Sequence, residues 1–331
     1  MKALIIQTAF IGDVILATPL ISELNRCIPG IETDVLVRSG NETLLTNFPG
    51  IRKILTWDKK NDKQKHLLEV LSAIRKEKYD LVINLQRFAS TGFLTAFSKA
   101  KEKIGFSKNP FSFLFDRSVE HKIGERNLHE TSRNLQLIGH LGADLNARPV
   151  LYPSAVDFKT VQQFKTEPYF CIAPTSVWFT KQVPASKWLE LIHRLLSTHP
   201  KAKIYLLGGP SDQQACEQLR MEGLSENLTN LSGRLSFLQT AALMKDAVWN
   251  FVNDSAPLHM ASAMNAPVTV FFCSTIPGFG FGPLSDLHEI TEVKGLSCRP
   301  CGLHGHKSCP EGHFKCALQL DMNPEAYLPA L

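Results

Sequence analysis

Apolar and polar residues alternate along the chain with two periods, one typical of buried strands and one typical of amphipathic helices. In the first half, short apolar runs predict strands at residues 3–7, 33–37, 54–57 and 81–85. Between these runs, apolar residues spaced three and four apart predict helices after residue 13, at 65–75 and at 130–141. Alternation of strand and helix is typical of a parallel sheet covered by helices.

The pattern is interrupted once and then resumes. Residues 142–153 are rich in turn-forming residues, include Pro149 and Pro153, and predict a linker. Beyond the linker, strands are predicted at residues 169–173, 203–207, 228–231, 248–252 and 268–272. Helices are predicted at residues 185–196, 212–221, 237–245 and 256–264. We therefore predict an α/β protein with two doubly wound domains, residues 1–150 and 151–331.

The first 20 residues are apolar enough to be mistaken for a signal peptide or a membrane span. Only Lys2 precedes the apolar run, which Gln7, Gly12 and Asp13 interrupt, and no small-residue cleavage site follows. A carboxylate in the middle of the run also disfavours a spanning helix. We expect this segment to be the first strand and helix of a cytoplasmic protein.

Asp13 stands where the predicted first strand turns into the predicted first helix. Such corners, at the carboxyl ends of strands in open α/β sheets, are where ligands bind. A carboxylate at the start of a helix also caps backbone N–H groups. The sequence thus leaves two interpretations open for Asp13, a carboxylate that faces a ligand and one that only caps the helix.

Charge is distributed unevenly over a chain that is otherwise of ordinary globular composition, with 44% hydrophobic and 20% charged residues. The net charge is +5. Residues 1–150 hold 22 Lys and Arg against 16 Asp and Glu, whereas residues 151–331 hold 14 against 15. A basic first half suggests an anionic partner, which could be nucleic acid, an acidic lipid headgroup or a phosphorylated saccharide. The alternative is a solvated surface, because residues 59–78 mix both signs along a predicted helix.

Neither half contains the Gly-x-Gly-x-x-Gly turn of dinucleotide-binding folds or a Walker phosphate loop, which disfavours a nicotinamide-dependent oxidoreductase. Three loops of the second half instead follow predicted strands, at residues 174–181, 207–212 and 252–259. In the first loop, Lys181 precedes a helix, where a cation and free N–H groups suit a phosphate. In the second, two glycines permit close ligand approach, although a plain tight turn capped by Ser or Asp explains them equally.

The third loop combines a helix start with a hydroxyl and a histidine. Asp254 or Ser255 is placed to cap the helix, and Pro257 fits its first turn. Capping does not account for His259 in the same turn, and the combination is typical of anion binding. Three such loops at strand ends of one domain together predict a ligand site.

The eight cysteines form two groups. Cys27, Cys171, Cys216 and Cys273 lie in apolar or helical patterns and are expected to be reduced core thiols. A glycine-rich segment holds Cys298, Cys301, Cys309 and Cys316 together with His304, His306 and His313.

The first two cysteines of this segment have the spacing of a structural zinc site, but the next gaps are seven and six residues. The alternatives are reduced thiols that pack a loop against the last helix, or a disulfide formed in air. We favour no metal, and we expect the segment to support residues 324–331 without a part in the chemistry.

Several of these motifs occur together in one family of enzymes. They are Gly12-Asp13-x-x-x-x-Thr18-Pro19, Thr180-Lys181 before a Pro/Trp helix, and Asn253-Asp254-Ser255-x-x-x-His259. To these are added Ile104-Gly105-Phe106, His129-Glu130-x-x-Arg133-Asn134-Leu135 and the cysteine-rich tail. In this combination, which covers nearly the whole chain, the sequence resembles the bacterial lipopolysaccharide heptosyltransferases of glycosyltransferase family 9.

The resemblance implies the GT-B architecture, in which two Rossmann-like domains face a cleft, and a reaction that needs no metal or other cofactor. The second domain would bind the nucleotide-sugar donor, ADP-heptose in the family, through Thr180, Lys181, Asp254, Ser255, Ala256 and His259. The first domain would bind an anionic acceptor, a phosphorylated lipid A and Kdo core, through Arg87, Arg126 and Arg133. Asp13 would be the general base of an inverting single displacement.

The resemblance also implies a cytoplasmic enzyme in peripheral contact with the inner membrane, with no nucleic acid partner. The sequence departs from the family pattern in two places: Ala256-Pro257, where the family often has glycine first, predicts a more rigid loop, and the glycine-rich apolar residues 277–283 leave the donor sugar open. Two alternatives remain: another surface-polysaccharide glycosyltransferase of this fold, and a non-catalytic protein that binds nucleotide sugars. The joint presence of Asp13, Lys181, Asp254 and His259 favours an enzyme.

Overall fold

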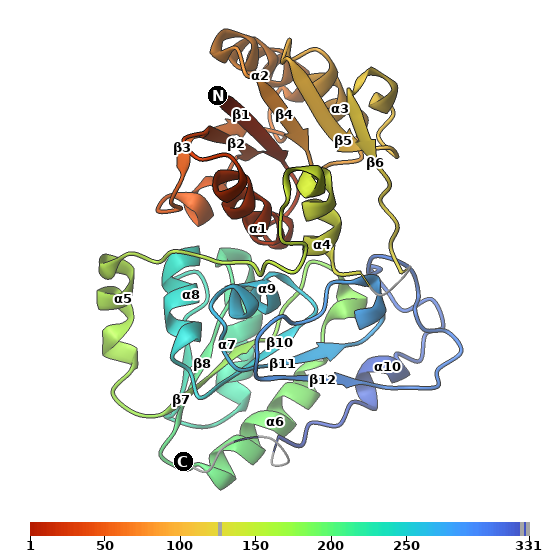
Figure 1. Cartoon of the computed structure of the whole chain (residues 1–331). Coiled ribbons are helices and arrows are strands. Elements are labelled where there is room, and N and C mark those ends of the chain that lie inside the picture. Colours follow the sequence, from red (N-terminus) through yellow and green to blue (C-terminus); the bar gives the residue numbers. More distant parts are fainter. Residues whose placement is uncertain (125–127, 325–327, 329–331) are drawn as a thin grey trace. The chain divides into compact units, whose positions relative to one another are not determined.

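The computed structural model describes residues 1–124, 128–324 and 328, and it divides into two compact units, Met1–Tyr152 and Pro153–Leu331. The division lies two residues beyond the sequence-predicted boundary. Each unit contains one parallel six-stranded sheet with helices packed against it (Figure 1). Within the described residues, no helix is long and apolar enough to cross a bilayer.

In the first unit, the strands are ordered β3-β2-β1-β4-β5-β6. Their bounds are β1 Lys2–Gln7, β2 Glu32–Arg38, β3 Ile51–Trp57, β4 Leu81–Asn84, β5 Glu102–Phe106 and β6 Arg117–Val119. The α-helices of this unit are α1 Ile11–Cys27, α2 Lys63–Glu77, α3 Ala89–Ala96 and α4 Glu130–Leu135.

The centre of this sheet is apolar on both faces because helices cover both. Ile5 of β1 pairs with Val35 of β2 on one side and with Ile83 of β4 on the other. Leu4 and Ile6 belong to a buried cluster that includes residues of α2 and α3. This continuous burial explains the uninterrupted apolar runs by which the central strands are recognised.

In the second unit, the strands are ordered β12-β11-β10-β7-β8-β9. Their bounds are β7 Tyr169–Ala173, β8 Lys203–Leu206, β9 Leu228–Asn230, β10 Trp249–Asn253, β11 Val268–Phe272 and β12 His288–Glu292. The α-helices are α5 Ala155–Val161, α6 Ala185–Thr198, α7 Gln213–Glu222, α8 Phe237–Lys245, α9 Ala256–Ala263 and α10 Lys315–Leu318. Phe170, Trp188, Phe251 and Phe271 are fully buried in its core.

The strands that the sequence pattern missed lie toward the sheet edges. Strand β5 begins with charged residues, β6 has three residues, and β12 is partly exposed along its whole length. Strand β3 begins three residues before its predicted start because Arg52 and Lys53 are exposed there. The predicted helix at 130–141 ends as an α-helix at Leu135 and continues as the 3₁₀ helix Gln136–Leu141. Strands that are not buried on both faces have no apolar run to reveal them.

Candidate active site

In each sheet the order of the strands reverses at an equivalent place, between β1 and β4 in the first unit and between β7 and β10 in the second. In doubly wound sheets, ligands bind beyond the carboxyl ends of the strands at this point. Asp13 lies in the first turn of α1, directly after β1. Lys181 ends the 3₁₀ turn that follows β7, and Asp254 directly follows β10. The topology therefore places all three residues where it predicts ligands.

Asp13 has a structural role at the start of α1. Its carboxylate accepts a hydrogen bond from the backbone N–H of Phe10, the residue before the helix, at 3.1 Å. Burial and, to a smaller extent, the Glu130 carboxylate together raise the pKa of Asp13 to about 6, although backbone hydrogen bonds and Arg87 act to lower it. A carboxyl group with a pKa near 6 is suited to accept a proton at neutral pH. Capping and proton transfer are thus compatible in this residue.

Glu130 carries the negative charge that faces Asp13, and it belongs to a buried network. Helix α4, which begins at Glu130, packs beside α1, with the Asn134 amide donating to the Leu16 carbonyl at 3.3 Å (Figure 1). His121 Nε2 lies 3.1 Å from both carboxylate oxygens of Glu130, and Arg133 Nε donates to one of them at 2.7 Å. Burial alone would raise the pKa of Glu130, but His121 and Arg133 hold it below its usual value. Glu130 is therefore ionised near Asp13.

The three arginines predicted to bind the acceptor differ in the structure. Arg87 follows β4, is partly exposed, and acts on the pKa of Asp13. Arg133 is 1% exposed and bonded to Glu130 and to the Leu128 carbonyl, so the expectation that it is an exposed acceptor contact is wrong. Arg133 belongs to the motif as a buried residue of α4 that binds Glu130. Arg126 lies outside the described residues.

Sequence reasoning missed two basic residues beside the turn into α1. Lys59 Nζ donates to the carbonyl and to the hydroxyl of Thr8 at 2.7 and 2.8 Å. Burial, together with the charges of Lys63 and Arg38, lowers the pKa of Lys59 to about 8. Arg38 lies over the ring of Phe10, 5.9 Å from its centroid. The signal was available, since Arg38 ends β2 and Lys59 closely follows β3, but the mixed charges of residues 59–78 leave open whether Lys59 faces a ligand or only solvent.

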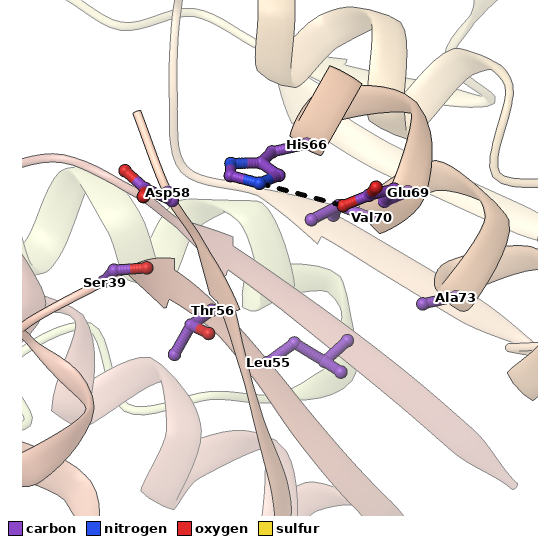
Figure 2. A pocket seen from close by; sticks show the side chains of 8 residues that line it. All are labelled: Ser39, Leu55, Thr56, Asp58, His66, Glu69, Val70 and Ala73. Carbon is purple, nitrogen blue, oxygen red and sulfur yellow. Dashed lines mark ion pairs between the residues drawn. The ribbon is translucent and has the colours of Figure 1, made fainter. Parts of the chain in front are cut away.

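A cavity of about 350 Å³ lies on the β3 side of this unit, between that edge strand and α2 (Figure 2). Its lining residues are Ser39, Leu55, Thr56, Asp58, His66, Glu69, Val70 and Ala73. His66 Nε2 and Glu69 Oε2 lie 3.9 Å apart across its wall. The lining contains none of the predicted site residues, so this cavity is distinct from the corner that holds Asp13.

In the second unit, the partly exposed Lys181 forms an ion pair with the buried Asp254. Lys181 Nζ lies 2.7 Å from Asp254 Oδ2, and the Thr275 hydroxyl donates to the same oxygen at 2.6 Å. Asn253 brings the loops together, because its amide oxygen accepts from the Val183 N–H at 3.0 Å while its amide nitrogen donates to the carbonyls of Ala173, which ends β7, and Thr175. The cluster therefore joins loops from neighbouring strands β7 and β10.

The other residues predicted to bind the donor lie in different surroundings. Thr180 is buried, and its hydroxyl is bonded to Ser274 and to the His306 N–H. Ser255 precedes α9, but its hydroxyl makes no capping hydrogen bond with the helix and lies 3.3 Å from the Asn253 carbonyl. Ala256 is the first residue of α9, and the buried His259 is its fourth. The expectation that the Ser255 side chain caps α9 is therefore wrong, and the Asp254 carboxylate is bonded to Lys181 and Thr275.

The glycine-rich loop at residues 207–212 is a tight turn. Asp212 Oδ2 accepts from the Gly209 N–H at 2.7 Å, and residues Pro210–Asp212 form a 3₁₀ turn. A Cβ added at Gly208 would lie 2.8 Å from Asp212 Cβ. The Asp212 carboxylate thus stabilises the turn by a hydrogen bond, which supports the interpretation of this loop as a plain tight turn.

All eight cysteines are free thiols in the structure, and Cys171, Cys216, Cys273 and Cys316 are buried. Cys316 packs in the core with Leu320 and Met322, which agrees with thiols that pack the segment against the domain. Cys298 Sγ lies 4.0 Å from His313 Nε2. Within the described residues, no three His, Cys, Asp or Glu side chains are grouped to hold a metal ion.

A family model for glycosyltransferase family 9 (heptosyltransferase) matches residues 67–313, which is most of the chain. The chain belongs to glycosyltransferase family 9. Its relatives include a lipopolysaccharide heptosyltransferase 3 from Escherichia coli, 29% identical, with 80% of this chain and 82% of that protein covered. Lipopolysaccharide heptosyltransferase 1 from Pseudomonas aeruginosa is 24% identical, with 91% and 86% covered. The protein is therefore a glycosyltransferase of the heptosyltransferase family.

Solved structures of this family have the same fold. Escherichia coli ADP-heptose lipopolysaccharide heptosyltransferase II superposes with a TM-score of 0.78 at 20% identity, with 96% of this chain and 99% of that chain covered. An E. coli heptosyltransferase solved with ADP-2-deoxy-2-fluoro heptose has a TM-score of 0.68, also at 20% identity, with 88% and 92% covered. The two parallel sheets with their helices are thus the two Rossmann-like domains of the GT-B architecture, as predicted.

Proposed function

We propose that the protein transfers a heptose from ADP-heptose to the anionic inner core of lipopolysaccharide, with inversion at the anomeric carbon. The observation that carries this proposal is Asp13, a carboxyl group with a pKa near 6 at the ligand-binding corner of the first sheet. Relatives named as lipopolysaccharide heptosyltransferases support the substrates, and the relative solved with an ADP-heptose analogue supports the donor.

The reaction we propose is a single displacement. The acceptor hydroxyl oxygen attacks the anomeric carbon of the heptose, and its proton passes to Asp13. The bond between that carbon and the diphosphate oxygen breaks, and ADP leaves with the electron pair. Lys181 and the amino end of α9 would stabilise the negative charge of the leaving diphosphate. Attack opposite the leaving group inverts the configuration.

We assign the donor to the second unit and the acceptor to the first. Helix α9 has no acidic residue in its first turn and no side-chain cap, so its amino end is suited to a diphosphate. Lys181, Asp254 and His259 are the donor residues that we retain, with Ser255 and Ala256 at the start of the helix. In the first unit, Arg38, Lys59 and Arg87 supply positive charge for the phosphorylated acceptor near Asp13.

We also propose peripheral contact of the first unit with the cytoplasmic face of the inner membrane. Four exposed apolar side chains around α3 support this membrane contact: Phe88, Phe97, Phe113 and Leu114. Phe97 packs against the rings of Phe93 and Phe111, and the Asn109 amide ties this loop to the Phe88 carbonyl at 3.1 Å. Exposed Lys99 and Lys108 lie in the same stretch, and aromatic and basic side chains together are typical of binding to anionic bilayers.

Transfer assays with ADP-, GDP- and UDP-sugars and a defined lipid A–Kdo acceptor test the enzymatic proposal, with the product anomer read by NMR. Transfer from ADP-heptose alone, with inversion, is expected. A preference for another nucleotide sugar, or retention, would overturn it. Sedimentation with anionic vesicles tests the membrane contact: Phe113→Ser with Leu114→Ser should reduce binding, whereas Val156→Ser, which replaces an exposed apolar residue of the second unit, should not.

A further inference from the structure

The cysteine-rich segment contacts the Lys181 turn, which corrects the expectation that it only supports the carboxyl end of the chain. We call residues 299–306 the strap. The Thr180 N–H donates to the His306 carbonyl at 3.1 Å, and the His306 N–H donates to the Thr180 hydroxyl at 2.7 Å. The strap therefore holds Thr180, the residue before Lys181, by two hydrogen bonds in opposite directions.

The Ser274 loop lies between the two segments and bonds to both. The Ser274 N–H donates to the Thr180 carbonyl at 3.2 Å, and its hydroxyl donates to that of Thr180 at 3.1 Å. The Cys301 N–H donates in turn to the Ser274 carbonyl at 3.0 Å. Thr180 and Ser274 are each 1% exposed, so these bonds are shielded from water. Buried hydrogen bonds of this kind fix the position of the turn.

Gly305 brings the strap backbone against the Lys181 side chain. A Cβ added at Gly305 would lie 2.4 Å from Trp178 Cβ and 2.9 Å from Lys181 Cγ, closer than real Cβ contacts allow. The Lys181 stem thus lies on a surface that only glycine can provide. A flexible lysine side chain supported along its stem keeps fewer rotamers open for its ammonium group.

Arg299 attaches the strap to the other half of the ion pair. Its guanidinium donates to the Cys273 carbonyl at 2.7 Å and to the Thr275 carbonyl at 2.6 Å, and it pairs with Glu292 at 2.6 Å. The Thr275 side chain is the one that bonds to Asp254. The strap is therefore connected to Lys181 through Gly305 and to Asp254 through Arg299 and Thr275.

We propose that the strap is a positioning element for donor binding, and that Gly305, Arg299 and Thr180 hold the Lys181 ammonium and the Asp254 carboxylate in the geometry that receives the donor diphosphate. The proposal rests on the proposed function, because it assumes that Lys181 faces that diphosphate. None of the three residues needs to touch the donor. They act through Lys181 and Asp254.

Calorimetric titration of the full-length protein with ADP and with adenosine tests this role. Gly305→Ala should weaken ADP binding by about tenfold, the effect of misplacing one charge-assisted contact, and should change adenosine binding much less. Gly139→Ala is the matched control, since a Cβ there meets only Leu145 at 3.7 Å, and it should leave both affinities unchanged. Equal losses for ADP and adenosine in Gly305→Ala would overturn the proposal.

A double-mutant cycle separates the strap from the proposed function. If the strap acts through Lys181, Gly305→Ala should add little to the loss of ADP affinity already caused by Lys181→Ala. Additive losses would overturn the positioning role. If Lys181→Ala leaves ADP affinity unchanged, the donor assignment fails instead. If Lys181→Ala weakens ADP binding and a folded Gly305→Ala does not, only the strap proposal fails.

If Gly305→Ala does not fold, a second pair of variants tests the same proposal. Thr180→Val removes the hydroxyl that accepts from His306, whereas Thr180→Ser retains it. Thr180→Val should raise the KM for the donor about tenfold, and Thr180→Ser should restore a KM close to that of the unchanged protein. A high KM in both variants would show that the hydroxyl bond does not position Lys181.

Discussion

At the amino end of helix α1 in the first unit, the Asp13 carboxylate accepts a hydrogen bond from the backbone. Helix α9 of the second unit has no acidic residue in its first turn and no side-chain cap. Both helices follow a strand next to the point where the strand order reverses. Asp13 places negative charge at the first helix start, with ionised Glu130 nearby. At the second helix start, Asp254 directly precedes the N-cap residue Ser255 and is paired with Lys181.

This difference shows how one topology supports two kinds of chemistry. The first corner favours proton acceptance because burial and a neighbouring carboxylate raise the pKa of Asp13. The second corner is suited to a diphosphate because its helix amino end is not occupied by a carboxylate of its own. We therefore expect substitutions at the two corners to affect different steps, proton transfer at the first and donor binding at the second.

The largest effect is expected at the first corner. Asp13→Asn keeps the size and much of the capping ability of the side chain but removes its basicity, so turnover should fall by about 100–10,000-fold. ADP affinity should remain nearly unchanged, because the donor is assigned to the second unit. Steady-state kinetics with calorimetry measures both. Near-normal turnover would show that Asp13 only caps α1.

At the second corner, the expected effect is on binding. Lys181→Ala should weaken ADP binding by roughly 10–150-fold, which is the contribution of one charge-assisted contact with a phosphate. Adenosine binding should change little, because adenosine has no phosphate. Titration calorimetry with both ligands measures the contrast. Equal losses would mean that Lys181 is needed for the shape of the loop and not for the diphosphate.

The sequence predicts the central strands and both ligand-binding corners, because strands buried on two faces are uniformly apolar and because motifs mark the corners. It does not reveal the surroundings of those motifs. Arg133 belongs to the same motif as Glu130 and looks available for an acceptor, but α4 buries it. Gly305 lies 124 residues beyond Lys181 in the chain, and no local pattern connects the two. Contacts between distant segments depend on packing that periodicity does not encode.

The pH dependence of activity should distinguish the groups of the first corner. Asp13 must be ionised to accept a proton, so kcat/KM should fall about tenfold per pH unit below its pKa of about 6. Lys59, with its pKa lowered to about 8, should lose its charge above that value and weaken acceptor binding. A bell-shaped profile is therefore expected. In Lys59→Arg the basic limb should move to higher pH while the acid limb stays, and an unchanged basic limb would remove Lys59 from the acceptor site.

Stability should respond to Asp13 with the opposite sign to activity. The pKa of Asp13 is raised in the folded chain, so the folded state favours the protonated carboxyl. Its contribution to stability is present below the ordinary value of 3.8 and is lost as the pH rises through about 6. At pH 7.5, Asp13→Asn should therefore raise the free energy of unfolding by roughly 1–3 kcal/mol. Denaturant unfolding at pH 7.5 and 4 measures the difference, and equal stability of the two chains at both values would refute the raised pKa.

The smallest expected effect tests whether α9 lacks a side-chain cap. Ser236 caps α8 by accepting from the Gln239 N–H at 3.2 Å, whereas the Ser255 hydroxyl makes no such bond with α9. Ser236→Ala should lower the free energy of unfolding by about 1 kcal/mol, and Ser255→Ala by less than about 0.5 kcal/mol. Urea unfolding without ligand compares the two. Equal losses would mean that Ser255 caps α9 in solution. The amino end of α9 would then be occupied by its own side chain, as that of α1 is by Asp13, and the contrast between the two corners would rest on Lys181 alone.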